Sequence, residues 1–135
     1  MKVRRRARIL ALQALYEIDA TQHLPGSVID RRLGEDPLPE DGEAFVRELI
    51  TGVLKHKADL DDMIQKYAPE WPIDQMAVID RNVLRMAIFE FYVGKLTPIK
   101  VAINEAVELA KLFGSDSAPR FINGVLGAVA AQGSA

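Results

Sequence analysis

Apolar residues recur along most of the chain at the three- and four-residue spacing of amphipathic helices, and they do not alternate with polar residues as in strands. The first helical pattern runs from about Arg4 to about Ala20, and its apolar side chains point almost all round the axis. That arrangement is typical of a central core helix. Pro25-Gly26 ends this region, and Ser27 is a suitable N-cap for a short helix to about Leu33.

Residues 34–42 (GEDPLPEDG) form the clearest loop, because they hold two prolines and four acids. An apolar stripe then runs from about Glu43 to Tyr67 and predicts one long helix or two collinear ones, since Lys57 occupies a position where the stripe expects an apolar residue. The prolines of residues 69–72 (PEWP) end it. We expect a boundary there between an N-terminal half, residues 1–68, and a C-terminal half, residues 69–135, which together make one compact domain.

The second half predicts three more helices. The first covers residues 74 to 93, and Thr97 followed by Pro98 suggests an N-cap with proline at the first helical position of a helix ending near Phe113. Gly114 suits a C-cap, and Asp116 or Ser117 suits the start of a last helix to about residue 131. The predicted fold class is all-α, with about three helices in each half.

Composition excludes several classes of protein. The 135 residues are 49% hydrophobic with a formal net charge of −2, which argues against disorder. The absence of cysteine excludes disulfides, thiolate metal sites and cysteine nucleophiles. No apolar run approaches the length needed to span a bilayer, so a cytoplasmic protein is expected.

The charge is unevenly distributed. Residues 1–8 carry five basic side chains and no acid, whereas the remainder holds 12 basic and 19 acidic residues. The basic residues are Lys2, Arg4, Arg5, Arg6 and Arg8. Arginines bind phosphates bidentately and stack on exposed bases, and cations near a helix N-terminus oppose the helix dipole, so stability alone would favour acids there. The cluster favours nucleic-acid binding, and the alternative is a solvated terminal charge run.

No other pattern points to catalysis or to a cofactor. Asp59, Asp61 and Asp62 lack the glycine and distal glutamate of a calcium loop, and acids at a helix N-terminus explain them better. His23 and His56 are isolated in sequence, and there is no glycine-rich phosphate loop or serine nucleophile motif. We therefore expect no catalytic residue, no cofactor-binding residue and no metal ligand.

Glu90 falls on an apolar stripe, in register with Val83 and Met86. A carboxylate in that position needs a partner, either an arginine or backbone donors. A general acid is conceivable, but a structural hydrogen-bond anchor is the favoured interpretation.

Four strings, in this order and spacing, resemble the NusB family of bacterial transcription antitermination factors. They are RRRARILALQALYEID, LITGVLKHKADLD, IDRNVLRMAIFEF and TPIKVAINEAVELAKLFGSDSAPRFINGVLG, and the match covers about nine tenths of the chain. The resemblance implies two three-helix bundles packed side by side and a protein without catalysis or cofactor. It also implies binding to boxA, a short single-stranded RNA element of nascent transcripts, together with the ribosomal small-subunit protein that acts as NusE.

The resemblance further implies that this heterodimer joins the RNA polymerase elongation complex with other Nus factors and opposes termination, notably in ribosomal RNA operons. The family's arginine-rich motif falls on Arg4, Arg5, Arg6 and Arg8, and its remaining RNA surface falls on Tyr67, Arg120 and Phe121. Its surface for the basic ribosomal protein falls on Tyr16, Asp74 and Asp80. The chain departs from the family at Ser117, where an aspartate is frequent, and at Pro119.

Three alternatives stay open. A NusB-like domain precedes the catalytic domain of some ribosomal RNA methyltransferases, although this chain without cysteine cannot be that enzyme alone. The arginines could instead grip an acidic protein partner in a purely protein-binding scaffold. Finally, a homodimer could hide the arginine site, and the sequence does not decide whether one forms.

Overall fold

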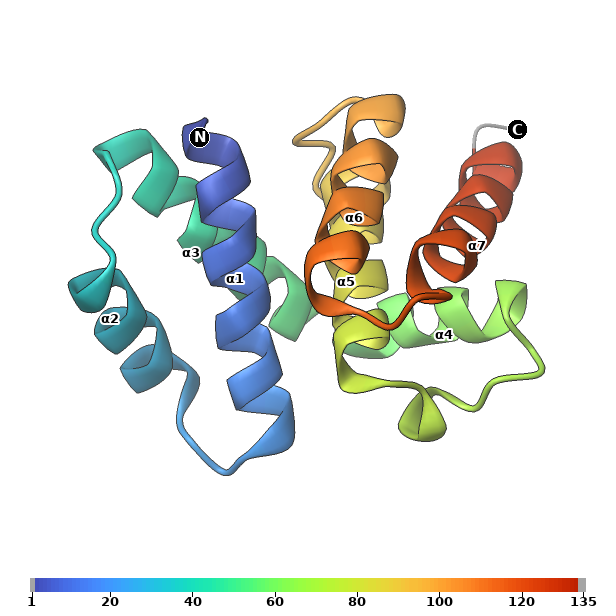
Figure 1. Ribbon diagram of the computed structural model, residues 1–135, viewed down its shortest axis with the longest axis horizontal. Coiled ribbons are helices and arrows are strands. Elements are labelled where there is room, and N and C mark those ends of the chain that lie inside the picture. Colours follow the sequence, from blue (N-terminus) through green and yellow to red (C-terminus); the bar gives the residue numbers. More distant parts are fainter. Residues whose placement is uncertain (1, 134–135) are drawn as a thin grey trace. The chain divides into compact units, whose positions relative to one another are not determined.

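In the computed structural model, which describes residues 2–133, every regular element of the described chain is helical (Figure 1). The all-α fold class is therefore confirmed. The elements in chain order are α1 (Val3–Ala20), α2 (Pro25–Glu35), α3 (Glu40–Lys55), α4 (Lys57–Tyr67), the 3₁₀ turn η1 (Ile73–Gln75), α5 (Val78–Ile88), the π-helical turn η2 (Phe89–Val93), α6 (Ile99–Phe113) and α7 (Ala118–Gly133).

The chain divides into a first unit, Met1–Thr51, and a second unit, Gly52–Ala135. This division falls inside α3, and not at residues 68/69 as the prolines of residues 69–72 suggested. The physical reason is that α4 packs against α5 and α7, so it belongs to the second unit. The second unit therefore contains four complete helices and not three.

Helix α2 begins two residues before the expected cap. Pro25 occupies the first turn and Leu24 the N-cap position, so the proline starts the helix where it was expected to end a region. This placement costs nothing, because the missing N–H of a proline at the first helical position would have no partner in the helix. The helix also continues through Gly34 to Glu35, which shortens the predicted loop to residues 36–39.

The first unit buries apolar residues on several sides of α1, as the sequence predicted, and α2 packs beside that helix. Glu17 of α1 is also buried, although it is charged. Its carboxylate accepts hydrogen bonds from His23 Nδ1 at 2.7 Å, from Arg31 and from Arg32 Nη2 at 2.9 Å. These partners hold the pKa of Glu17 at about 2 and join the two helices.

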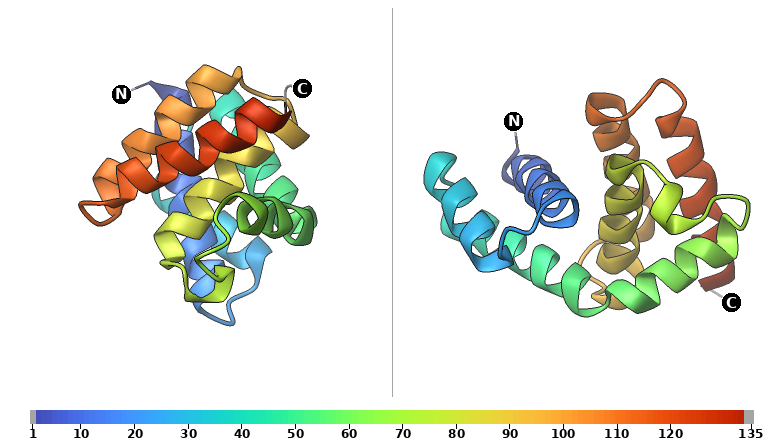
Figure 2. Two further views of the ribbon diagram at one scale, coloured as in Figure 1. Left: turned by 90° about the vertical axis from the view of Figure 1, so that its right-hand side faces the viewer. Right: turned by 90° about the horizontal axis from the view of Figure 1, so that it is seen from below.

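The second unit is organised around α5, which contacts α4, α6 and α7 (Figure 2). Arg85 of α5 is buried and forms a bidentate ion pair with Asp61 of α4, at 2.7 Å from Nε and 3.0 Å from Nη2. Arg85 also donates to Asn82 Oδ1 at 3.2 Å. Asp61 is thus a structural partner of an arginine across two helices.

Glu90 lies in the π-helical turn and is 2% exposed. Its Oε1 accepts a hydrogen bond from the hydroxyl of Thr97 at 2.7 Å, and its main-chain oxygen accepts from the N–H groups of Leu96 and Thr97. The predicted hydrogen-bond anchor is confirmed, and the Thr97 hydroxyl is one of its donors. Thr97 does not cap α6, because its side chain turns into the core and Pro98 takes the cap position.

Two glycines make room for the ring of Phe89. A Cβ atom at Gly52 would overlap the far end of that ring, and one at Gly94 would lie 2.9 Å from Phe89 Cζ. The ring of His56 stacks on Phe89, with the two centroids 6.0 Å apart. The close approach explains why a helix-weakening glycine stands inside α3.

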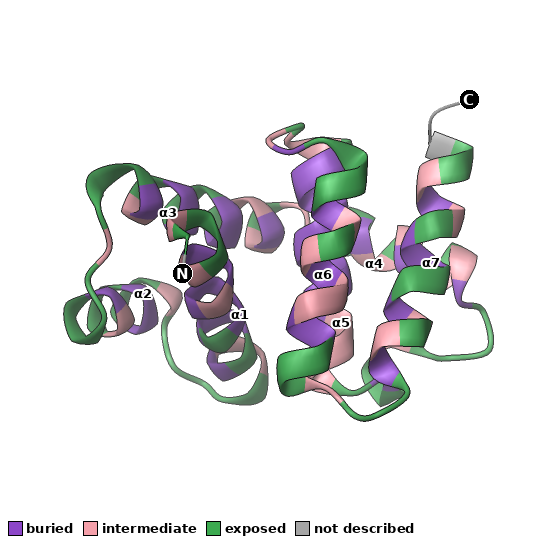
Figure 3. Ribbon diagram, turned by 45° about the horizontal axis from the view of Figure 1, so that its top comes forward, coloured by how far each residue is buried: buried purple, intermediate pink, exposed green. Residues whose placement is uncertain are grey.

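Figure 3 shows buried and exposed residues recurring at helical spacing along α6. Ala102, Ala106 and Ala110 are buried, whereas Val101 and Leu112 are exposed. No helix within residues 2–133 is long and apolar enough to cross a membrane.

Candidate nucleic-acid interface

The arginines of α1 do not form one uniform row. Arg4 and Arg8 are four residues apart, share one face of the helix, and place their guanidinium carbons 4.0 Å and 5.2 Å from the ring centroid of Phe45 in α3. Both arrangements are cation–π contacts. Arg4 remains exposed, but Arg8 is only 5% exposed.

Arg6 points to a different part of the first unit. Its Nη2 donates to Asp36 Oδ1 and to the main-chain oxygen of Pro37, both at 3.2 Å, and its side chain is 36% exposed. This pair fastens the start of α1 to the loop between α2 and α3. Arg5 and Lys2 are exposed.

The start of α1 is electrostatically unfavourable in isolation. Its first turn contains no acidic residue, and the positive end of the helix dipole adds to the charges of the arginines. An anion placed there would gain from both the dipole and the guanidinium groups. The exposed cations Lys2, Arg4 and Arg5 and the half-exposed Arg6 therefore make an anion-binding surface, and Arg8 is a buried support beneath it.

A recess of about 430 Å³ in the second unit collects several residues that the sequence placed at functional sites. Arg120 and Phe121 line it from the first turn of α7, together with Asp80 from the first turn of α5. The other lining residues are Trp71, Gln75, Met76, Ala77 and Ser117. Two residues predicted to bind RNA and one residue predicted to bind the protein partner thus line the same recess.

Local packing sets the geometry of this recess. Gly114 caps α6, and a Cβ atom there would lie 2.6 Å from Ala118 Cβ, so glycine allows the turn before α7 to close tightly. In the first turn of α7, Phe121 is half-buried and Arg120 is exposed. Burial raises the pKa of the half-buried Asp80 carboxyl above its ordinary value.

The remaining predicted residues do not line the recess. Tyr67 is half-buried at the end of α4, and Lys66 Nζ lies 5.4 Å from its ring centroid. Asp74 is exposed on η1, and Tyr16 is 43% exposed on α1 of the first unit. Ser117 lies directly before α7 as expected, and Pro119 falls in its first turn.

Sequence reasoning missed Trp71, Gln75 and Met76. The sequence around Trp71 was interpreted only as the end of a helix. A tryptophan between two prolines, however, cannot belong to a regular helical core. That feature of the sequence could have identified an exposed aromatic residue. Met76 carries no comparable signal, because an isolated methionine is ordinary core material.

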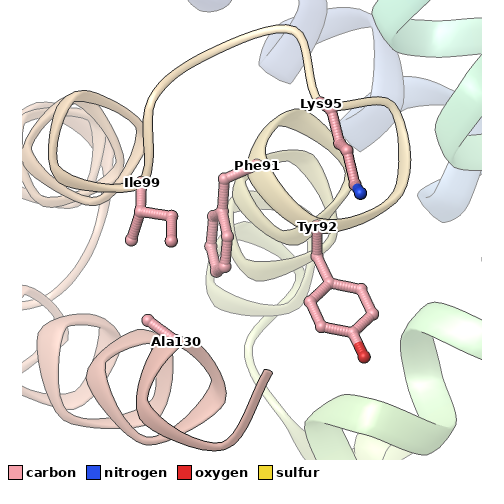
Figure 4. Close-up of a pocket in the computed structure, with 5 residues that line it drawn as sticks. All are labelled: Phe91, Tyr92, Lys95, Ile99 and Ala130. Atoms are coloured by element: carbon pink, nitrogen blue, oxygen red, sulfur yellow. The ribbon is translucent and has the colours of Figure 1, made fainter. Parts of the chain in front are cut away.

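Figure 4 shows a second recess of about 370 Å³ in the same unit, lined by Phe91, Tyr92, Lys95, Ile99 and Ala130. Phe91 lies between Ile99 and Tyr92, and the Lys95 ammonium lies on the Tyr92 side. Lys95 adopts a left-handed backbone conformation with φ of 51°. Among residues 2–133, no group of three or more histidine, aspartate or glutamate side chains is arranged to hold a metal ion.

The fold and these surfaces together define a class: an all-helical protein with a cationic helix start and an aromatic recess beside an arginine. Comparison with known proteins is more specific. Residues 5–131 match the NusB family, and the chain belongs to that family. The resemblance found in the sequence is therefore confirmed.

Curated relatives and solved structures support the assignment over nearly the whole chain. The transcription antitermination protein NusB of Roseiflexus castenholzii is 51% identical over 132 residues, covering 96% of this chain and 93% of that protein. The structure of T. maritima NusB has a TM-score of 0.88 at 32% identity, covering 96% of this chain and 91% of its own. A crystal structure of the antitermination factors NusB and NusE with double-stranded RNA has a TM-score of 0.89 at 26% identity, covering 98% of each chain.

Proposed function

We propose that this protein is a transcription antitermination factor that binds boxA-type single-stranded RNA in nascent transcripts, together with the ribosomal small-subunit protein that acts as NusE. The heterodimer joins the RNA polymerase elongation complex with other Nus factors in the cytoplasm and suppresses termination, notably in ribosomal RNA operons. The observation that carries the proposal is the cationic start of α1, where exposed arginines stand without any acid in the first turn. Family membership supports it.

Within this proposal the basic residues have different roles. Lys2, Arg4 and Arg5 contact phosphates, and Arg6 joins them by exchanging its bond to the exposed Asp36 for one to the RNA. Arg8 supports Arg4 through the ring that both contact. Arg8 is buried and cannot reach a phosphate without leaving its site, so it does not contact the RNA directly.

Base contacts fall to the second unit. Phe121 stacks on a base while the neighbouring Arg120 meets a phosphate, and Tyr67 stacks on a further base. Aromatic stacking of this kind requires unpaired bases, because the faces of paired bases are covered by their neighbours in the helix. The solved NusB–NusE complex holds double-stranded RNA, so strand preference must be measured for this chain.

The partner surface comprises Tyr16, Asp74 and Asp80, whose acids suit a basic ribosomal protein. The half-buried Asp80 carboxylate lacks part of its hydration, which raises its pKa. The Asp80→Asn substitution should therefore weaken the heterodimer while leaving the folded chain at least as stable, and calorimetric titration and thermal melting measure the two effects. The exposed Asp62→Asn variant is the charge-matched control. Unchanged heterodimer affinity in Asp80→Asn would remove Asp80 from the interface.

Binding titrations test the function as a whole. The full chain is titrated with labelled boxA-like RNA, scrambled single-stranded RNA and a duplex of the boxA-like sequence, each with and without the ribosomal protein. We expect the boxA-like strand to bind most tightly, and the ribosomal protein to increase its affinity. Equal affinity for the boxA-like and scrambled strands in the presence of the partner would contradict boxA recognition, and RNase-resistant capture of acidic proteins alone would favour the protein-binding scaffold.

A further inference from the structure

The segment between α4 and α5 is held in place by one amide side chain. Gln65 Nε2 donates to the main-chain oxygens of Ala68 at 3.2 Å and Trp71 at 2.6 Å, and Gln65 Oε1 accepts from the N–H of Ile73 at 2.9 Å. One glutamine thus satisfies three backbone groups of a segment that forms no regular helix of its own before η1. Without it the Ala68 oxygen would keep the N–H of Trp71 as its donor, but the Trp71 oxygen and the Ile73 N–H would lose the side-chain partner that holds them.

A second side chain holds the same segment from the opposite end. Arg81 of α5 donates from Nη1 to the main-chain oxygens of Ile73 at 3.2 Å and Asp74 at 3.4 Å. The N–H of Trp71 also bonds the main-chain oxygen of Ala68 at 3.1 Å. The backbone that carries Trp71 is therefore fixed before any ligand arrives.

Trp71 itself is 55% exposed on this fixed backbone and lines the recess that contains Phe121 and Arg120. A large aromatic side chain carried on a fixed backbone and left half-covered is available for stacking without the entropic cost of ordering that backbone. Two aromatic residues from different elements, with a guanidinium beside one of them, match the flat base and the phosphate of a single nucleotide.

We propose that Trp71 is a second base-stacking residue of the recess, and that Gln65 is the positioning residue that holds Trp71 against the incoming base. This inference rests on the proposed RNA-binding function and extends it. The occupant is one unpaired nucleobase of the bound RNA. A peptide segment of the protein partner is the competing occupant, and tryptophan fluorescence distinguishes it from a nucleobase.

Trp71 is the only tryptophan in the chain, so its fluorescence reports on this recess alone. The full chain is titrated with end-labelled boxA-like RNA, and label anisotropy and tryptophan emission are followed in the same samples. We expect the emission to be quenched with the same midpoint as the rise in anisotropy, since stacking on a base quenches an indole. Because Asp80 of the same recess belongs to the proposed partner surface, the partner protein is added first, its own emission is subtracted, and RNA added to the preformed heterodimer should then quench Trp71 with the midpoint of RNA binding.

Variants give the matching affinities. Trp71→Ala should weaken RNA binding by about 5- to 150-fold with an unchanged salt dependence, because one stacked base is lost. Trp71→Phe should restore most of the affinity. Tyr92→Ala removes a comparably exposed aromatic side chain from the other recess and should change nothing.

Gln65→Ala should reduce both the affinity and the extent of quenching at saturation, measured at a temperature where the variant is fully folded. A residue that only stabilised the fold would leave the quenching of the folded protein unchanged. Gln65→Glu keeps the acceptor for Ile73 but loses both donated bonds, so it should fall between the wild type and Gln65→Ala.

The outcomes distinguish this inference from the proposed function. A rise in anisotropy without quenching, or wild-type affinity in Trp71→Ala, would overturn the role of Trp71 and leave RNA binding intact. Quenching by the partner protein with no further change when RNA binds the heterodimer would show that a peptide occupies the recess. No rise in anisotropy with any RNA would instead refute the proposed function. If Trp71→Ala fails to fold, wild-type quenching still decides.

Discussion

The four arginines of α1 should respond differently to salt. Arg4 and Arg5 are exposed and the side chain of Arg6 is 36% exposed, whereas Arg8 is 5% exposed. Each phosphate neutralised on a single strand contributes about −0.7 to the slope of log affinity against log salt, so the three arginines together with Lys2 and Arg120 give about −3.5. Raising salt from about 50 to about 200 mM should then weaken binding by roughly 130-fold. Fluorescence anisotropy with labelled boxA-like RNA at several salt concentrations measures the slope.

Single substitutions separate contact from support. Arg5→Ala should reduce the magnitude of the slope by about 0.7, equally for boxA-like and scrambled RNA. Arg8→Ala should leave the slope unchanged and lower the free energy of unfolding by about 1–2 kcal/mol, because it removes a desolvated cation–π contact with Phe45. Phe121→Ala should cost about 1–3 kcal/mol of binding without changing the slope.

Arg47→Ala is the charge-matched control. Arg47 is an exposed arginine of α3 in the same unit, paired with Asp30 at 3.0 Å and with Glu43 at 3.3 Å. Its removal changes the net charge as Arg5→Ala does, but it should leave the slope unaltered. If Arg8→Ala lowered the magnitude of the slope as much as Arg5→Ala, Arg8 would contact a phosphate in spite of its burial. If the quadruple alanine variant of the α1 arginines kept wild-type affinity and slope, the cluster would be only a solvated charge run.

Three further predictions concern stability. Glu90→Ala should lower the free energy of unfolding by about 1–3 kcal/mol, because it leaves the Thr97 hydroxyl without its acceptor. Denaturant titration of Glu90→Ala, of Thr97→Ala and of the double variant should show that the two losses are less than additive. Gly52→Ala should lower the free energy of unfolding by about 1–3 kcal/mol through overpacking against Phe89. A Cβ atom at Gly124 meets no atom within 4 Å, so Gly124→Ala should raise the free energy of unfolding by about 1 kcal/mol. Equal melting temperatures of the two variants would contradict both expectations. Because the pKa of Glu17 falls from 4.5 to about 2 on folding, its contribution to stability is complete above about pH 4.5 and is lost as pH falls towards 2; melting temperatures of Glu17→Gln should lack this part of the pH dependence.

The helical class and most helix positions could be predicted because each depends on local information. A 3.6-residue apolar period, with proline and glycine as breaks, is set by residues close in sequence. Gly114 was correctly expected to cap a helix, and the break near Lys57 corresponds to the separation of α3 and α4 at His56. The basic cluster of α1 is likewise a local feature.

Errors arose where a local signal allows two outcomes. Pro25 can end one segment or start the next, and only packing of α2 beside α1 selects the second. Thr97 can cap a helix or turn inward, and the buried Glu90 decides between these because its carboxylate needs a donor. The prolines of residues 69–72 do end a helix, but they do not divide the chain, since α4 contacts α5 and α7.

Tertiary structure alone decided which charged residues are buried and support their neighbours, and which are exposed on the surface. Arg8 and Arg5 are equivalent in the sequence pattern, yet the Phe45 ring lies over Arg8 while Arg5 faces solvent. Glu17 and Arg32 are 15 residues apart and are joined only by the packing of two helices. The same holds for the recess, whose residues come from separate stretches of chain. Periodicity reports which face of a helix is buried, whereas the identity of a side chain's neighbours depends on contacts between distant segments, which no local pattern encodes.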